Sequence, residues 1–178
     1  MKSTDDPNAY KYYKKARYLI DTQKERKDLE KADILLQKAI KSDSKFLFAH
    51  TQRAVVAYQN GDYELSEEIL DDALEIANQD GSRVSNGYVY SIYGQLYIVW
   101  RRSKQATKYN KLALDAFSHI NDQLQDAMII LNLGTSYLHS GNNNLALTHY
   151  KKSLEIAKLY EDRFSQSLSY GQIGNVYS

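Results

Sequence analysis

Large apolar residues and a glycine recur at fixed spacings along the sequence. Tyr90, Tyr93, Gly94 and Tyr97 form one such group, and the segments 130–137 and 170–177 repeat its pattern of large-x-x-large-Gly-x-x-Tyr. Spacings of three and four residues place side chains on one face of a helix. The chain has one proline and eight glycines in 178 residues, and the runs between its turn residues are too long for strands. The pattern predicts an all-α fold.

The pattern is an internal repeat, because Gly94, Gly134 and Gly174 follow one another at equal steps. Small residues at Ala16 and Ala54 extend it toward the N-terminus at nearly the same step. A fixed period of about 40 residues is typical of stacked supersecondary units. We predict four and a half helical hairpins in one domain over residues 7–178, with repeats at 7–43, 44–81, 82–121 and 122–161, a half repeat at 162–178, and a flexible terminus at 1–6.

Turn residues support this register. The segments 60–62 (Asn-Gly-Asp) and 141–144 (Gly-Asn-Asn-Asn) each offer a helix-ending glycine followed by capping residues. Asp6 and Pro7 supply a cap and a proline at the first position of the first helix. The turn of the first hairpin, around 22–27, is longer than its counterparts. Breaks between repeats are expected at 42–45, 80–82, 119–122 and 161–163.

The recurrent glycines and tyrosines are expected to be structural. A glycine inside a helix costs about 1 kcal/mol relative to alanine, so Gly94, Gly134 and Gly174 predict helix crossings too close for a side chain. Tyrosines one turn further along the same face are expected to fill each hairpin as core residues; they are Tyr97, Tyr137 and Tyr177.

The repeat resembles the tetratricopeptide repeat, whose signature is large-x-x-Leu-Gly-x-x-Tyr followed by Ala-x-x-x-Phe. The segment 74–77 (Leu-Glu-Ile-Ala) returns at 154–157, and Ala106 returns as Ala146. The resemblance implies a right-handed α-α superhelix, a tetratricopeptide solenoid. Repeats of this family have about 34 residues. The longer period of this chain is similar to that of a subgroup found in kinesin light chains, spindle-orientation adaptors and bacterial regulators.

Charge and composition narrow the classes of partner. The net charge of +1 argues against nucleic-acid binding and against a membrane-surface role. The charges are nevertheless segregated: residues 46–82 carry eight acids and one arginine, whereas residues 83–116 carry six bases and one acid. We interpret these blocks as solvated helix faces. Cysteine is absent, so thiolate metal sites and disulfides are excluded. No apolar leader or long apolar run is present, and we expect a soluble cytoplasmic protein.

The sequence contains no motif typical of a catalytic site. The four histidines, His50, His119, His139 and His149, have no metal-ligand spacing. The segment 171–174 (Gly-Gln-Ile-Gly) lies inside a predicted helix and therefore is not a phosphate loop. We expect no enzyme activity, no cofactor and no metal.

The resemblance places the partner-binding surface on the concave face, which the first helix of each hairpin lines. Amides and rings dominate the expected groove residues, which suit a peptide backbone and its side chains. These residues are Tyr13, Arg17, Gln52, Tyr88, Gln95, Asn132, Thr135, His139, Gln172 and Asn175. The function expected is an adaptor module that binds a protein or peptide segment. The alternative is a regulatory, sensory or self-association module of a larger bacterial signalling protein with a cyclase, kinase or DNA-binding domain.

The last predicted helix carries an apolar face without a second helix to cover it. Its apolar residues are Leu168, Tyr170, Ile173, Val176 and Tyr177. Natural arrays end in a helix with a polar outer face. The expectation is therefore a fragment of a longer protein that self-associates through this end.

Overall fold

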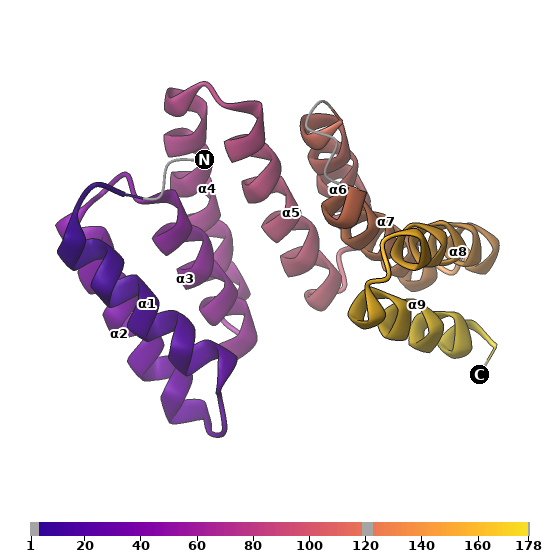
Figure 1. Cartoon of the computed structure of the whole chain (residues 1–178), viewed down its shortest axis with the longest axis horizontal. Helices are drawn as coiled ribbons and strands as arrows, with labels where there is room; N and C mark the ends of the chain where they lie inside the picture. Colours follow the sequence, from indigo (N-terminus) through magenta and orange to yellow (C-terminus); the bar gives the residue numbers. More distant parts are fainter. Residues whose placement is uncertain (1–3, 119–122, 178) are drawn as a thin grey trace. The chain divides into compact units, whose positions relative to one another are not determined.

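The computed structural model describes residues 4–118 and 123–177, and all regular structure in those ranges is helical (Figure 1). An all-α fold built from helical hairpins is therefore confirmed. The expected break at 119–122, and with it His119, lies outside the described residues. The helices are α1 (Pro7–Asp21), α2 (Arg26–Ser42), α3 (Leu47–Asn60), α4 (Tyr63–Asp80), α5 (Arg83–Val99), α6 (Ser103–Phe117), α7 (Gln123–His139), α8 (Asn143–Leu159) and α9 (Arg163–Val176).

Residue contacts divide the chain into two compact units, 1–92 and 93–178, called unit 1 and unit 2 below. The boundary falls inside α5, so residues 83–92 of this helix belong to unit 1 and 93–99 to unit 2. Each unit is built by packing helices that follow one another in the sequence. That neighbour-on-neighbour packing is what a repeat with a short period produces.

In unit 1, α1 packs against α2, α2 against α3 and α3 against α4 (Figure 1). Small residues let α1 and α2 approach closely, because Ala9, Ala16 and Ala32 are fully buried in their shared core. The Arg53 Nε donates to Asp33 Oδ1 at 2.9 Å, which fixes α3 to α2 by a half-buried ion pair. This hairpin stacking holds the first helices α1 and α3 in a defined order.

The start of α1 follows the predicted cap. Asp6 Oδ1 accepts hydrogen bonds from the backbone N–H groups of Asn8 and Ala9, and Pro7 opens the helix. The Thr4 hydroxyl donates to Asp43 at the end of α2. Residues 4–6 are thus tied to the first hairpin, while residues 1–3 of the terminus predicted to be flexible lie outside the described residues.

The predicted hairpin turns are present at two glycines. Gly61 ends α3 with φ of 91°, and Gly141 follows α7 with φ of 79°. Both values lie in the left-handed region, which glycine adopts without a steric penalty. Tight turns at these positions are therefore confirmed.

In unit 2, α6 packs on α7, α7 on α8, and α8 on α9. The predicted close helix contacts at Gly94 and Gly134 exist. The nearest atoms at each glycine belong to a side chain of the next helix and not to its backbone. A Cβ built on Gly94 would lie 2.5 Å from Asn110 Oδ1, and one on Gly134 would lie 2.5 Å from Tyr150 Cε1 and 3.2 Å from the Ala146 carbonyl oxygen. Each glycine thus makes room for a buried side chain of the next helix.

Three expectations about the last helix are wrong in part. No atom lies within 4 Å of a Cβ on Gly174, and Tyr177 is 72% exposed instead of being core. The physical reason is the same for both, since no second helix packs on this face of α9 among the described residues. Conversely, Leu168, Ile173 and Val176 of the expected exposed patch pack partly on Leu131 and Tyr150.

Candidate functional site

Unit 1 contains a continuous row of aromatic rings that crosses three first helices. Tyr10 and Tyr13 of α1 have ring centroids 6.5 Å apart, Tyr13 and Phe48 of α3 are 6.3 Å apart, and Phe48 and Tyr88 of α5 are 6.1 Å apart. Distances of about 4.5–7 Å are those of favourable aromatic pairs. We call Tyr10, Tyr13, Phe48 and Tyr88 the aromatic row.

A buried phenylalanine packs against two rings of the aromatic row. Phe46, which precedes α3, is 1% exposed and lies 5.1 Å from the Tyr13 ring and 6.4 Å from the Phe48 ring. Tyr13 and Phe48 also pack on the core shared by α1 and α2. Their rings are therefore held in place by packing, and a partner would meet a preformed surface.

The repeat register explains why these rings share a surface. Tyr10, Phe48 and Tyr88 stand six residues before the small positions Ala16, Ala54 and Gly94. Six residues along an α-helix correspond to one full turn and about 240° more. A side chain six residues before the small residue therefore points to a different side of the helix. The same face of successive first helices thus receives one ring from each repeat.

The row is accessible from solvent. Tyr10 is 45% exposed, and Tyr13, Phe48 and Tyr88 are half-buried. A half-buried ring leaves apolar carbon in contact with water, and covering that carbon with a partner's side chain stabilises the complex. The arrangement is suited to binding apolar side chains.

Polar groups flank the rings one helical turn further along. Arg17 follows Tyr13 on α1, and Arg17 Nη2 lies 3.4 Å from Asp21 Oδ1 in an exposed ion pair. Burial raises the pKa of Tyr13, and the Arg17 guanidinium partly opposes this rise. Gln52 follows Phe48 on α3, is half-buried, and its side-chain amide has no hydrogen-bond partner among residues 4–118 and 123–177. Gln52 can therefore donate to or accept from a peptide backbone beside the rings.

The structure unites the unit 1 residues predicted for the groove but adds two that the prediction missed. Phe48 bridges the predicted Tyr13 and Tyr88, while Arg17 and Gln52 flank them. Tyr10 and Phe48 were not predicted, although the steps from Tyr10 to Phe48 and on to Tyr88 equal those between the small positions. Testing every register position for a recurring side-chain type would have found them.

The predicted groove residues of unit 2 do not assemble in the same way. The Thr135 hydroxyl donates to the Leu131 carbonyl at 3.3 Å and accepts from the Tyr150 hydroxyl at 3.2 Å, so it serves the α7–α8 hairpin. Asn175 Nδ2 donates to Gln172 Oε1 at 3.4 Å on the exposed side of α9. The side chains of Thr135, Asn175 and Gln172 therefore have fewer hydrogen-bonding groups available for a partner.

The remaining three predicted residues of unit 2 are half-buried. They are Gln95 on α5 and Asn132 and His139 on α7. Burial lowers the pKa of His139, the charge of Arg101 lowers it further, and His139 Nδ1 is buried without a hydrogen-bond partner in the described part of the chain. A neutral imidazole is thus favoured at this position.

Two other kinds of site are missing from the described ranges. No three side chains of histidine, cysteine, aspartate or glutamate gather there as they would around a metal ion. No helix in those ranges combines the length and the apolar character needed to cross a bilayer.

The fold is similar to that of tetratricopeptide repeat proteins. A signal transduction ATPase with numerous domains, which has a tetratricopeptide repeat sensor and comes from Pyrococcus horikoshii, is similar over 97% of this chain with a TM-score of 0.82 and 23% identity. The chain spans 27% of that protein's length. PilF of Pseudomonas aeruginosa is similar over 96% of this chain and 77% of its own, with a TM-score of 0.71 and 20% identity.

A further structure with this fold is MamA of Desulfovibrio magneticus RS-1, similar over 99% of this chain and 97% of its own, with a TM-score of 0.59 and 13% identity. No protein-family model matches the sequence, and no curated protein sequence matches it. Identities this low are evidence for the fold alone.

Proposed function

We propose that the protein is a binding module that holds a protein or peptide segment against the aromatic row. The observation that carries this proposal is the unbroken sequence of ring contacts from Tyr10 to Tyr88 across α1, α3 and α5. Helical repeats present extended surfaces of this kind to elongated partners. Aromatic anchors dominate the binding free energy of many protein interfaces.

The partner's chemistry follows from the rings and their flanks. Three half-buried rings favour apolar or aromatic side chains, and Gln52 can hydrogen-bond the backbone between them. The rings come from successive first helices, so an elongated segment can contact several of them in turn. The binding step requires no catalytic chemistry.

The proposal is tested by selecting peptides on the immobilised full chain by phage display and measuring their affinity for matched variants. Tyr10→Ala removes a row residue that is 45% exposed, and Tyr160→Ala removes a tyrosine of nearly equal exposure, 48%, from the end of α8. We expect Tyr10→Ala to weaken binding about tenfold. Tyr160→Ala should leave binding unchanged.

Gln52→Ala gives a second readout, because loss of the amide should weaken binding without changing helix content. Peptides that bind both tyrosine variants equally well, and whose contacts map outside residues 10–88, would show that the row is not the binding surface. Nuclear magnetic resonance titration of the full chain locates those contacts.

A second candidate function is a sensory or regulatory module within a larger signalling protein. The similarity to the repeat sensor of the Pyrococcus horikoshii ATPase favours it, since that similarity extends over 97% of this chain. A sensor has to change state when its ligand binds. Fluorescence energy transfer between labels in unit 1 and unit 2 tests this, because a selected peptide should shift the distance distribution of a sensor and leave that of a simple adaptor unchanged.

A further inference from the structure

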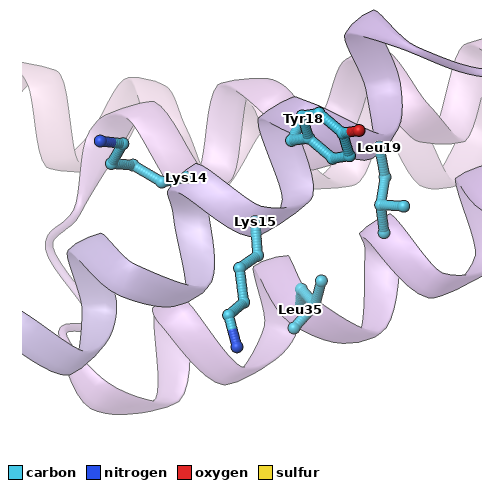
Figure 2. Close-up of a pocket in the computed structure, with 5 residues that line it drawn as sticks. All are labelled: Lys14, Lys15, Tyr18, Leu19 and Leu35. Carbon is cyan, nitrogen blue, oxygen red and sulfur yellow. The ribbon is translucent and has the colours of Figure 1, made fainter.

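Unit 1 also contains an apolar hollow between α1 and α2, and none of the residues that line it belongs to the aromatic row. Lys14, Lys15, Tyr18 and Leu19 of α1 and Leu35 of α2 line a space of about 400 Å³ (Figure 2). Pockets that hold ligands span about 300–1,000 Å³, so the hollow is large enough for a bulky apolar side chain.

The walls of the hollow are carbon. Leu19 and Leu35 pack partly on the core between the two helices, and Tyr18 lies beside Leu19 with 68% of its surface exposed (Figure 2). Figure 2 shows Lys15 reaching from α1 toward α2 beside Leu35, so that its aliphatic stem forms one wall and its ammonium group lies at the rim. Exposed apolar surface of this kind gains stability when a partner covers it.

The residues that line the hollow include two lysines and no acidic residue. Within the described residues neither Lys14 nor Lys15 forms a salt bridge, and the Lys14 ammonium lies 5.8 Å from the centre of the Tyr10 ring. Residues 7–42, which form the first hairpin, carry ten lysines and arginines against five aspartates and glutamates. The hollow therefore combines an apolar floor with a positive edge.

We propose that this hollow docks an acidic protein segment, in which one leucine or aromatic side chain fills the space and neighbouring carboxylates pair with Lys14 and Lys15. Charge complementarity selects the acidic residues, since the two ammonium groups attract carboxylates and repel a basic segment. The apolar floor favours a leucine or an aromatic side chain as the residue that fills the hollow. A nucleic acid fits less well, because arginine forks and several stacking rings, which nucleic-acid sites employ, are missing from the lining.

The test uses the full chain and two synthetic peptide series. In the first series a single leucine is flanked on both sides by glutamates, and in the second the same leucine is flanked by lysines. We expect the glutamate series to bind, with chemical-shift changes centred on residues 14–19 and 35, and affinity to fall as salt is added. Replacing the leucine by alanine in the peptide should abolish most of the binding.

A charge reversal supplies the matched protein variants. The pair Lys14→Glu and Lys15→Glu should weaken the glutamate peptides about tenfold or more. The pair Lys151→Glu and Lys152→Glu makes the same change of charge at two exposed, adjacent lysines of α8, and it should alter affinity less than twofold. Neither pair involves a buried residue, so circular dichroism should report folded protein for both.

Four outcomes would overturn the proposal. The first is equal binding of the two peptide series, and the second is equal loss of affinity in the two charge-reversed pairs. The third is binding of anionic phospholipid vesicles through residues 14–19 together with indifference to the peptide's leucine, which would identify a membrane surface. The fourth is a concentration-dependent shift of the same signals in peptide-free protein, which would identify a second copy of this chain as the occupant.

Discussion

The two units use aromatic residues differently, although they share one repeat register. In unit 1, the rings at the position six residues before the small residue lie on the surface; Phe48 contacts Tyr88 directly, and Tyr13 links Tyr10 to Phe48. In unit 2 that register position holds Met128 and Leu168. There the rings stack inside the hairpins instead, as Tyr93 and Tyr109 do with centroids 4.4 Å apart.

The small position shows the complementary difference. Unit 1 has alanine there, at Ala16 and Ala54, whereas unit 2 has Gly94 and Gly134, each in close contact with a side chain of the next helix. Those contacting residues, Asn110 and Tyr150, are fully buried and stand one repeat apart, and Leu70 occupies the same register position in unit 1. At Gly134 the glycine makes room for the Tyr150 ring, which is bulkier than leucine, whereas Asn110 beside Gly94 is smaller than Leu70. In unit 1, where alanine holds the small position, the rings of the aromatic row lie on the surface.

The largest expected effect comes from removing an interior ring. Tyr93 is 1% exposed and contacts the rings of Tyr97 and Tyr109, so Tyr93→Ala should lower the free energy of unfolding by about 3–5 kcal/mol. Tyr10→Ala, at the surface of unit 1, should change it by less than about 0.5 kcal/mol. Urea unfolding followed by circular dichroism measures both, and equal losses would remove the distinction between the units.

Alkaline pH should destabilise unit 1 through Tyr58, a half-buried tyrosine of α3. Burial raises the pKa of Tyr58 to about 12, from an ordinary value of about 10. The neutral form is therefore favoured in the folded state, and the stability it contributes is complete below pH 10 and is lost as pH rises toward 12. The loss should reach about 2–3 kcal/mol. Tyr58→Phe should flatten the dependence of stability on pH in this window, whereas Tyr160→Phe should leave it as steep as in the parent protein.

A methyl group on Gly134 tests the close packing in unit 2. Gly134→Ala places a carbon against the buried Tyr150 ring, and the cost of overpacking should exceed the gain in helix propensity, for a net loss of about 1–2 kcal/mol. Gly171→Ala is the matched control, because no atom lies within 4 Å of its Cβ, and it should be neutral or stabilising. Thermal melting distinguishes the two, and stabilisation by both would mean that Tyr150 can move aside freely.

The smallest effect concerns one hydroxyl. Tyr150→Phe removes the hydrogen bond that the Tyr150 hydroxyl donates to Thr135 Oγ1 in unit 2, and it should cost about 1 kcal/mol. Tyr10→Phe should cost nothing measurable, since the Tyr10 hydroxyl has no hydrogen-bond partner in the described part of the chain. Chemical unfolding of both variants at neutral pH checks this difference. Indistinguishable midpoints would show that the Tyr150 hydroxyl adds nothing to the α7–α8 hairpin.

Most of the fold could be predicted from the amino-acid sequence by itself. The period from Gly94 to Gly134, the turn glycines and the Asp6 cap are local signals, because helix ends and tight turns depend on residues a few positions apart. These signals located the hairpins and the left-handed glycines Gly61 and Gly141. They also placed Tyr13 and Tyr88 on first helices, where the structure joins them in one surface.

Only the tertiary structure decided which side chains meet. Phe48 bridges Tyr13 and Tyr88, which lie far apart in the sequence, and such contacts depend on how neighbouring helices pack. The same limit explains why Gly174 was assigned to a close crossing that does not exist: its local sequence matches that of Gly134, but no helix covers it in the described residues. A repeat specifies its own hairpin, whereas its contacts and exposed surface depend on what packs against it.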